Sequence, residues 1–169
     1  MDTRDIRQDM LQLTVDTIKK AQGVGLVMPC KTIDLCKALN DCGFPNFVEY
    51  QTMTGALSGV IKRGENGVYG ILLDEAATSE QQDRDLGHEI THMVSTHALS
   101  GLRCQRTELV DIGDLRELEA ENGGDWFVVL VSKTARELAA YDRSEFRHLV
   151  ESLNHDKRPR LWWLGRRWR

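Results

Sequence analysis

The sequence contains no Cys-x-x-Cys pair among its four cysteines, Cys30, Cys36, Cys42 and Cys104. This absence argues against a zinc site built from thiolates and against a thioredoxin-like redox motif. The first residues contain no apolar run of signal-peptide length, and no stretch approaches the roughly 18 apolar residues that a membrane helix needs. We therefore expect a cytoplasmic protein with reduced cysteines and no membrane partner.

The chain also lacks internal repeats, low-complexity segments and the composition of a disordered protein. Its 169 residues, of which 41% are hydrophobic and 28% are charged, suffice for one ordinary domain with its own core. Acidic residues outnumber basic ones, and the net charge is −4. A body of this charge does not favour wholesale binding of nucleic acid.

Basic residues are concentrated at the C-terminal end. Residues 155–169 hold six basic residues and one acid, so they carry +5, whereas residues 1–154 carry −9. We predict a single domain over 1–154 and a separate basic, Trp-rich tail over 155–169. Tryptophans interleaved with arginines can stack on bases and neutralise phosphates. We favour the simpler interpretation that the tail buries its tryptophans on the body or on a partner.

Hydrophobic periodicity predicts two helices at the start of the chain, followed by strands. Helical spacing of apolar residues covers residues 3–21, and a second helix begins near Thr32, as its cap, and closes at Gly43. Residues 47–74 are rich in Val, Tyr, Thr and Ile, and "ENG" between two such runs predicts a hairpin. Two or three antiparallel strands are therefore expected in this part of the chain.

The second half of the chain is predicted to be mostly helical. Thr78 or Ser79 can cap a helix, and apolar residues after them return to helical spacing. Residues 98–114 are predicted to form a loop, "WFVVLV" a buried helix or strand, and residues 133–154 an amphipathic surface helix. The pattern predicts an α+β fold in which a small antiparallel sheet of about three strands packs with helices.

The stretch "DRDLGHEITHMVSTH", residues 83–97, holds three of the five histidines. On a helix, His88 and His92 lie one turn apart on one face, where both imidazoles can bind a single zinc ion. Glu89 can point at a bound water without ligating the metal. This combination is what a hydrolytic zinc site requires. We therefore predict one Zn²⁺ per chain, His88 and His92 as ligands and Glu89 as the general base. Manganese or iron would also suit two histidines and a carboxylate.

A site of this kind needs a third protein ligand. His97 follows His92 by five residues and would lie off the ligand face. Glu121 and Asp125 are spaced i, i+4, so one carboxylate could bind the metal while the other accepts a hydrogen bond from a ligand histidine. The full set of candidates is His97, Glu117, Glu119, Glu121 and Asp125.

The segment "VYGILLDEAATSEQQDRDLGHEITHMVSTH" resembles the core of the ImmA/IrrE family of metallopeptidases. In that family a strand ending in asparagine or aspartate leads through a polar helix start to a His-Glu-x-x-His helix. Downstream, "ENGGDWFVVLV" is similar to the family pattern E-x-x-A-D-x-F-A-x-x-L. The resemblance covers about residues 45–132. It implies a zincin-like fold, with Glu121 as the third ligand and Asp125 as its outer-shell neighbour.

The chain departs from the family pattern at Asn122-Gly123-Gly124. Each glycine costs about 1 kcal/mol relative to alanine in a helix interior, and "ENGGD" taken alone is typical of a turn. The family's usual Leu-Met-Pro ending is replaced by "LVSK". Because these departures leave the register open, Glu117 and Glu119 stay as alternative third ligands.

The resemblance implies regulatory proteolysis. Members of the family act inside the cell and are often encoded beside a helix-turn-helix repressor of a phage or mobile element. They cleave that repressor and so switch on transcription. We therefore expect a zinc endopeptidase whose partner is such a protein substrate, and we do not expect a nucleic-acid partner. Two alternatives are a non-catalytic zinc-binding regulatory module, against which Glu89 argues, and a nucleic-acid-binding protein that acts through the basic tail.

Overall fold

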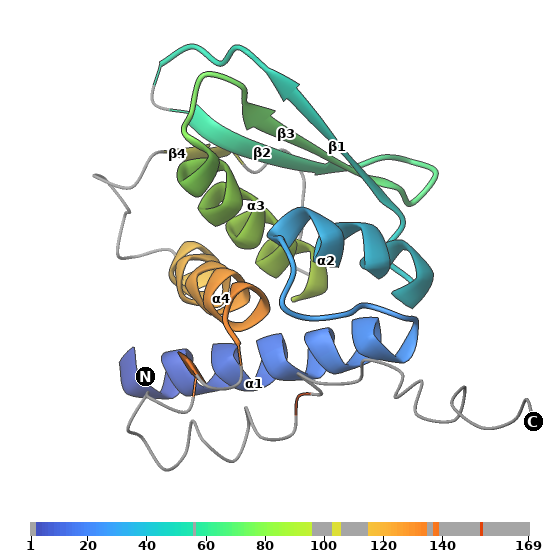
Figure 1. Ribbon diagram of the computed structural model, residues 1–169. Coiled ribbons are helices and arrows are strands. Elements are labelled where there is room, and N and C mark those ends of the chain that lie inside the picture. The colour runs from blue at the N-terminus through green and yellow to red at the C-terminus, as the bar shows by residue number, and fades with distance from the viewer. Residues whose placement is uncertain are drawn as a thin grey trace, which may run out of the picture.

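The protein has an α+β fold, as the sequence predicts, in which a small sheet is packed with helices (Figure 1). The computed structural model describes residues 3–55, 57–95, 103–105, 115–134, 137–138 and 153. The helices are α1 (Thr3–Gly23), α2 (Thr32–Ala38), the short 3-10 helix η1 (Leu39–Cys42), α3 (Ser79–Val94) and α4 (Leu115–Ser132). The strands are β1 (Asn46–Gln51), β2 (Leu57–Arg63), β3 (Tyr69–Asp74) and β4 (Arg103–Gln105).

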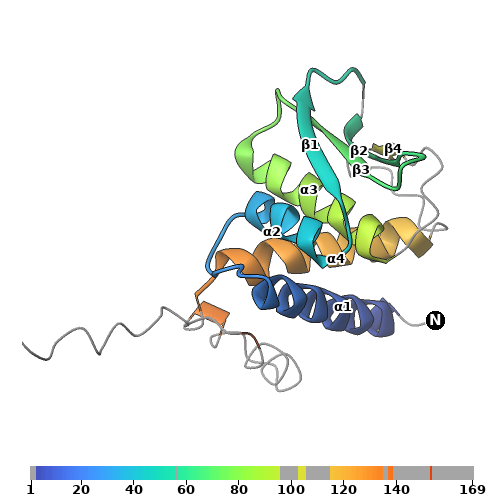
Figure 2. The same ribbon diagram turned by 90° about the vertical axis from the view of Figure 1, so that its right-hand side faces the viewer.

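The elements form layers stacked in one direction. Figures 1 and 2 show the same order, from the sheet through α3 and then α4 to α1, with α2 beside α3. The contacts between elements agree with this order, since α3 packs against β2, β3 and α4, and α4 packs against α1. The helix that carries "HEITH" therefore lies in the middle of the molecule, with the sheet on one side and α4 on the other.

The strand order in the sheet is β1-β3-β2-β4. β2 and β3 form the predicted antiparallel hairpin, which turns at Gly67 with a positive φ of 80° and is closed by a hydrogen bond from Gly64 N to Val68 O of 2.8 Å. β1, however, pairs with β3 in parallel. The prediction of an antiparallel sheet is therefore wrong for this pair, and the sheet is mixed.

Asp74, at the end of β3, binds the connection between β1 and β2. This connection passes the end of β3, which is why β1 runs parallel to β3. The chain leaves β1 beside Asp74, which pairs with Gln51, and must pass the end of β3 to enter β2. Asp74 Oδ1 accepts hydrogen bonds from Met53 N (3.4 Å), within this crossing, and from Ala76 N (3.1 Å). Local alternation of apolar and polar residues carries no information about such a crossing, because parallel and antiparallel strands share the same period.

Most of the predicted helices are present. α1 covers the predicted residues 3–21 and buries one stripe, which includes Leu11, Val15 and Ile18. The second helix begins at Thr32, so that Lys31 and not Thr32 occupies the cap position, and Gly43 closes it with a φ of 90°. The helical regions therefore follow the periodicity of the sequence, with small shifts at their ends.

The cap of α3 is Thr78, one of the two predicted cap residues. Its side chain accepts a hydrogen bond from Gln81 N of 3.3 Å. Near the other end, Thr91 Oγ1 donates to Gly87 O within the same helix at 3.0 Å. Leu86, Ile90 and other side chains of α3 are buried, so the helix is part of the core.

The "ENGGD" stretch lies inside α4, although taken alone it is typical of a turn. The two glycines lie where α4 meets α3. A Cβ on Gly124 would be 2.7 Å from His88 N, and a Cβ on Gly123 would be 2.5 Å from Thr91 Cγ2. Gly87 on α3 is equally constrained, since its Cβ would be 2.8 Å from Gly124 O. The glycines therefore let the two helix backbones approach more closely than any side chain would allow.

Several sequence predictions fall on the undescribed part of the chain. The prediction of a loop over 98–114 is wrong at Arg103–Gln105, which form strand β4. The other residues of this segment lie outside the described residues. The predicted helix over 133–154 lies almost entirely outside them, and the tail over 155–169 wholly so. Among the described helices, none combines the length and the apolar character needed to cross a membrane.

We expect Gly124→Ala to lower the free energy of unfolding by about 1–3 kcal/mol, as overpacked cores do. The new Cβ would meet backbone atoms, His88 N at 2.7 Å and Gly87 C at 3.1 Å, which cannot rotate away. Urea denaturation measures the change. Gly23→Ala, at the end of α1, is the matched control because nothing lies within 4 Å of its Cβ. Equal stability of the two variants would contradict the close packing of α3 and α4.

Candidate metal centre

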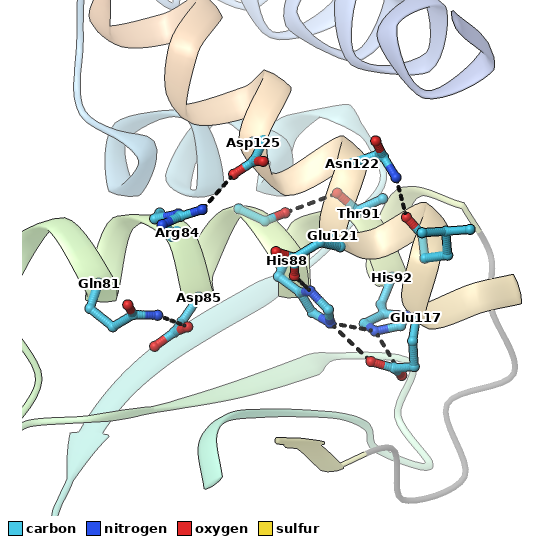
Figure 3. Close-up of polar contacts among 12 residues, drawn as sticks. Gln81, Arg84, Asp85, His88, Thr91, His92, Glu117, Glu121, Asn122 and Asp125 are labelled. Atoms are coloured by element: carbon cyan, nitrogen blue, oxygen red, sulfur yellow. Dashed lines mark hydrogen bonds and ion pairs between the residues drawn. The ribbon is translucent and has the colours of Figure 1, made fainter. Parts of the chain in front are cut away.

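His88 and His92 lie one turn apart on α3 and face each other, as the i, i+4 spacing predicts. Their Nε2 atoms are 3.1 Å apart, and the ring centroids are 4.8 Å apart with an angle of 70° between the rings. The His92 side chain is fully buried, whereas 14% of the His88 side chain is exposed. Two imidazole nitrogens therefore point at one place at the edge of the core (Figure 3).

Glu117, in the first turn of α4, completes the group (Figure 3). Its carboxylate straddles the two rings, with Oε2 at 3.3 Å from His88 Nε2 and Oε1 at 3.4 Å from His92 Nε2. Hydrogen bonds from His88 first, and then from His92, hold the pKa of Glu117 far below its ordinary value. The acid therefore presents a negatively charged carboxylate to both histidines.

These three side chains fit a zinc ion. Donor atoms that are each about 2.0–2.1 Å from a tetrahedral zinc ion lie about 3.3–3.4 Å from one another. The distances of 3.1 Å between the imidazole nitrogens and of 3.3 and 3.4 Å from these nitrogens to the carboxylate are close to that geometry. Among the described residues, His88, His92 and Glu117 form a group with donor atoms all within 4.8 Å of one another. The donor set, two imidazoles and a carboxylate, also matches known catalytic zinc sites.

Glu121, which the sequence favours as third ligand, lies one turn along α4 and meets the other side of His88. Its Oε2 is 3.7 Å from His88 Nδ1. Its interaction with His88 is the main cause that lowers the pKa of Glu121 below its ordinary value. A carboxylate at the nitrogen away from the metal fixes the tautomer and orientation of a ligand histidine. The structure therefore favours Glu117 as the third ligand and places Glu121 at the other side of His88, where an outer-shell partner would lie.

Asp125 does not take the outer-shell place predicted for it. It pairs with Arg84 at 3.2 Å, and both side chains are more than half exposed (57% and 56%). Glu119 is not in the metal group, and His97 lies outside the described residues. Of the acids that the sequence offers on α4, the structure thus brings Glu117 and Glu121 to the histidines.

Glu89 follows His88 directly on α3 and reaches toward β2. Its side chain is fully buried, and it is not part of the group formed by His88, His92 and Glu117. Its Oε1 would be 2.7 Å from a Cβ on Gly59, in β2. The carboxylate therefore lies between α3 and the sheet.

Sequence reasoning missed Gly59. A glycine in the interior of a strand often marks the close approach of another group, and "LSGVIKR" carries that signal. Which group approaches cannot be read from the strand, because the contact is made by a helix thirty residues further along the chain.

Comparisons of the chain with protein-family models, with curated proteins and with solved structures give no match.

We expect Glu117→Ala to abolish tight zinc binding, because it removes the only carboxylate that contacts both Nε2 atoms among the described residues. Glu121→Gln should weaken zinc binding by about 10–100-fold, as the loss of an outer-shell partner does. Competition with a chromogenic chelator measures both affinities. Glu119→Ala, on the same helix, is the matched control and should bind zinc like the wild type. A larger loss of zinc affinity in Glu121→Gln than in Glu117→Ala would instead support Glu121 as the third ligand, as the family resemblance implies.

Zinc should raise the thermal stability of the wild type, because an ion that binds the folded state stabilises it by about 2.7 kcal/mol at one hundred times its Kd. The measurement compares the unfolding midpoint with zinc and with a chelator. His92→Ala, which removes a buried ligand, should lose this difference. A midpoint that zinc raises equally in His92→Ala would place the ion elsewhere.

Proposed function

We propose that the protein is a zinc-dependent endopeptidase. The observation that carries the proposal is the convergence of His88, His92 and Glu117 on one place, with a buried glutamate, Glu89, next to the first histidine. Three protein ligands leave one position of a tetrahedral ion for water or substrate, as in catalytic sites, whereas structural zinc sites use four protein ligands.

Zinc held by His88, His92 and Glu117 would lower the pKa of water toward neutrality and polarise the carbonyl of a peptide bond. Glu89 accepts the proton of the attacking water and later gives it to the leaving amine. Glu121 lies beside His88 Nδ1, where a carboxylate favours the ring orientation that directs Nε2 at the site. Each step uses a side chain that α3 or α4 keeps in a fixed position.

The non-catalytic alternative keeps the zinc and dispenses with the base. Burying an ionisable carboxylate costs free energy, and a site that only holds a metal does not need it. Glu89 is fully buried and directly follows the candidate ligand His88 in the chain. This placement supports the enzyme over a binding module. The nucleic-acid alternative depends on the basic tail, which lies outside the described residues.

The resemblance to the ImmA/IrrE family suggests the substrate. We propose a helix-turn-helix repressor that the enzyme cleaves in the cytoplasm, which would make the proteolysis a switch of transcription. The features that support this choice are the "HEITH" helix after a strand that ends in Asp74 and the acidic residues of α4 that reach the histidines.

We expect Glu89→Gln to abolish cleavage while leaving zinc in place. The amide keeps the size of the side chain but cannot accept a proton, and general-base steps contribute about 10²–10⁴-fold. The measurement is cleavage of a repressor encoded next to the protease gene, coexpressed and followed by size on a gel, together with zinc content.

Glu80→Gln, an exposed residue in the first turn of the same helix, is the matched control and should cleave like the wild type. Equal cleavage by Glu89→Gln and the wild type would mean that another protease produced the fragments. Repressor binding without cleavage by the wild type would favour the non-catalytic module.

A further inference from the structure

Gly59 lies on the face of the sheet that covers α3. In the hairpin it pairs with Leu73, and Ile61, two residues further along β2, pairs with Ile71. These three apolar side chains are fully buried, and β2 and β3 both pack against α3. Because alternate residues of a strand share a face, a side chain at position 59 would point toward the helix with them.

The carboxylate of Glu89 fills the place that this side chain would take. A Cβ on Gly59 would be 2.7 Å from Glu89 Oε1 and 3.5 Å from both Cγ and Cδ. The Glu89 side chain therefore lies along the backbone of β2 at this residue. Even one methyl group at position 59 would force the carboxylate to move.

β2 is irregular at the same place. Its register with β4 shifts between Leu57 and Gly59. Irregularities of this kind are frequent next to active sites, where they change the direction of a side chain or of the backbone. The glycine and the irregularity together shape the part of the strand that Glu89 contacts.

We propose that Gly59 is a positioning residue of the metal centre. The missing side chain at position 59 sets where the Glu89 carboxylate lies relative to His88, His92 and Glu117. The inference rests on the proposed role of Glu89 as a base beside a metal. Gly59 acts through Glu89 alone, and a displacement of a catalytic group by about 1 Å can reduce a rate on the order of 100-fold.

The steric part of the inference is tested without metal. In chelator, Gly59→Ala should lower the thermal midpoint by roughly 2–10 °C, as overpacking does in a chain of this size. In a Glu89→Ala background, where the space is empty, the same substitution should change the midpoint little. Gly70→Ala, in the neighbouring strand, is the matched control: its Cβ would be 2.9 Å from Phe47 Cζ, on a side chain that is 50% exposed. Its effect should be the same with and without Glu89.

The functional part is tested on the zinc-loaded protein with acetohydroxamate. This small chelator binds a metal through its oxygens and can donate a hydrogen bond to a carboxylate beside it. Gly59→Ala should weaken acetohydroxamate binding on the order of tenfold and keep zinc affinity near that of the wild type. In a Glu89→Gln background it should have no further effect, which is the coupling expected of residues in contact. For repressor cleavage, kcat should fall while KM stays unchanged.

The outcomes separate this inference from the proposed function. Acetohydroxamate binding by Gly59→Ala like that of the wild type overturns the positioning role, even if the wild type cleaves the repressor. An effect of equal size with and without the Glu89 carboxylate overturns it too, because Gly59 would then act through the fold. Coupled losses in acetohydroxamate binding without any repressor cleavage support the positioning role and reject the proposed substrate. If the zinc-loaded wild type does not bind acetohydroxamate, both the positioning role of Gly59 and the proposed function are overturned.

Discussion

The close contact between the backbones of α3 and α4 is the constraint on which the metal centre depends. Gly87 and Gly124 face each other, and Gly123 lies against Thr91, at distances that exclude a Cβ. Three glycines inside helices cost about 3 kcal/mol of helix propensity. Burial of large side chains on the two helices, among them Ile90 and Phe127, offsets that cost. The local sequence of α4 is therefore poor for a helix because the packing of the helix pair requires it.

This contact also sets the register of the two helices. Residue numbers that rise along α3 meet numbers that fall along α4, because Gly124 contacts His88 whereas Gly123 contacts Thr91 and Glu117 reaches His92. The helices are thus antiparallel, and residues one turn apart on α4 reach different atoms of one imidazole. Glu117 faces Nε2 of His88 and Glu121 faces Nδ1. Of these two acids, Glu117 is thus the candidate ligand, and Glu121 is placed to orient His88.

Local patterns predicted much of the fold and the proximity of the two histidines. The i, i+4 histidines, the cap at Thr78 and the turn at Gly67 each depend on a few neighbouring residues, and the structure agrees with them. The parallel pairing of β1 with β3 and the choice of Glu117 over Glu121 depend on contacts between distant segments. In the sequence, Glu121 pairs with Asp125 by i, i+4 spacing, and Glu117 is an alternative ligand. Spacing could not show how far α4 is shifted along α3, since glycine contacts decide that.

The exposure of the site residues differs from one side of the centre to the other. Glu89, which reaches β2, and His92 are fully buried, whereas His88, Glu117 and Glu121 keep 14%, 22% and 33% of their side chains exposed. Solvent therefore reaches the candidate centre at His88, Glu117 and Glu121, and the proposed base is held by β2. A general base works best when packing fixes its position. Support from a strand, with the ligands supported by two packed helices, gives each group its own rigid element.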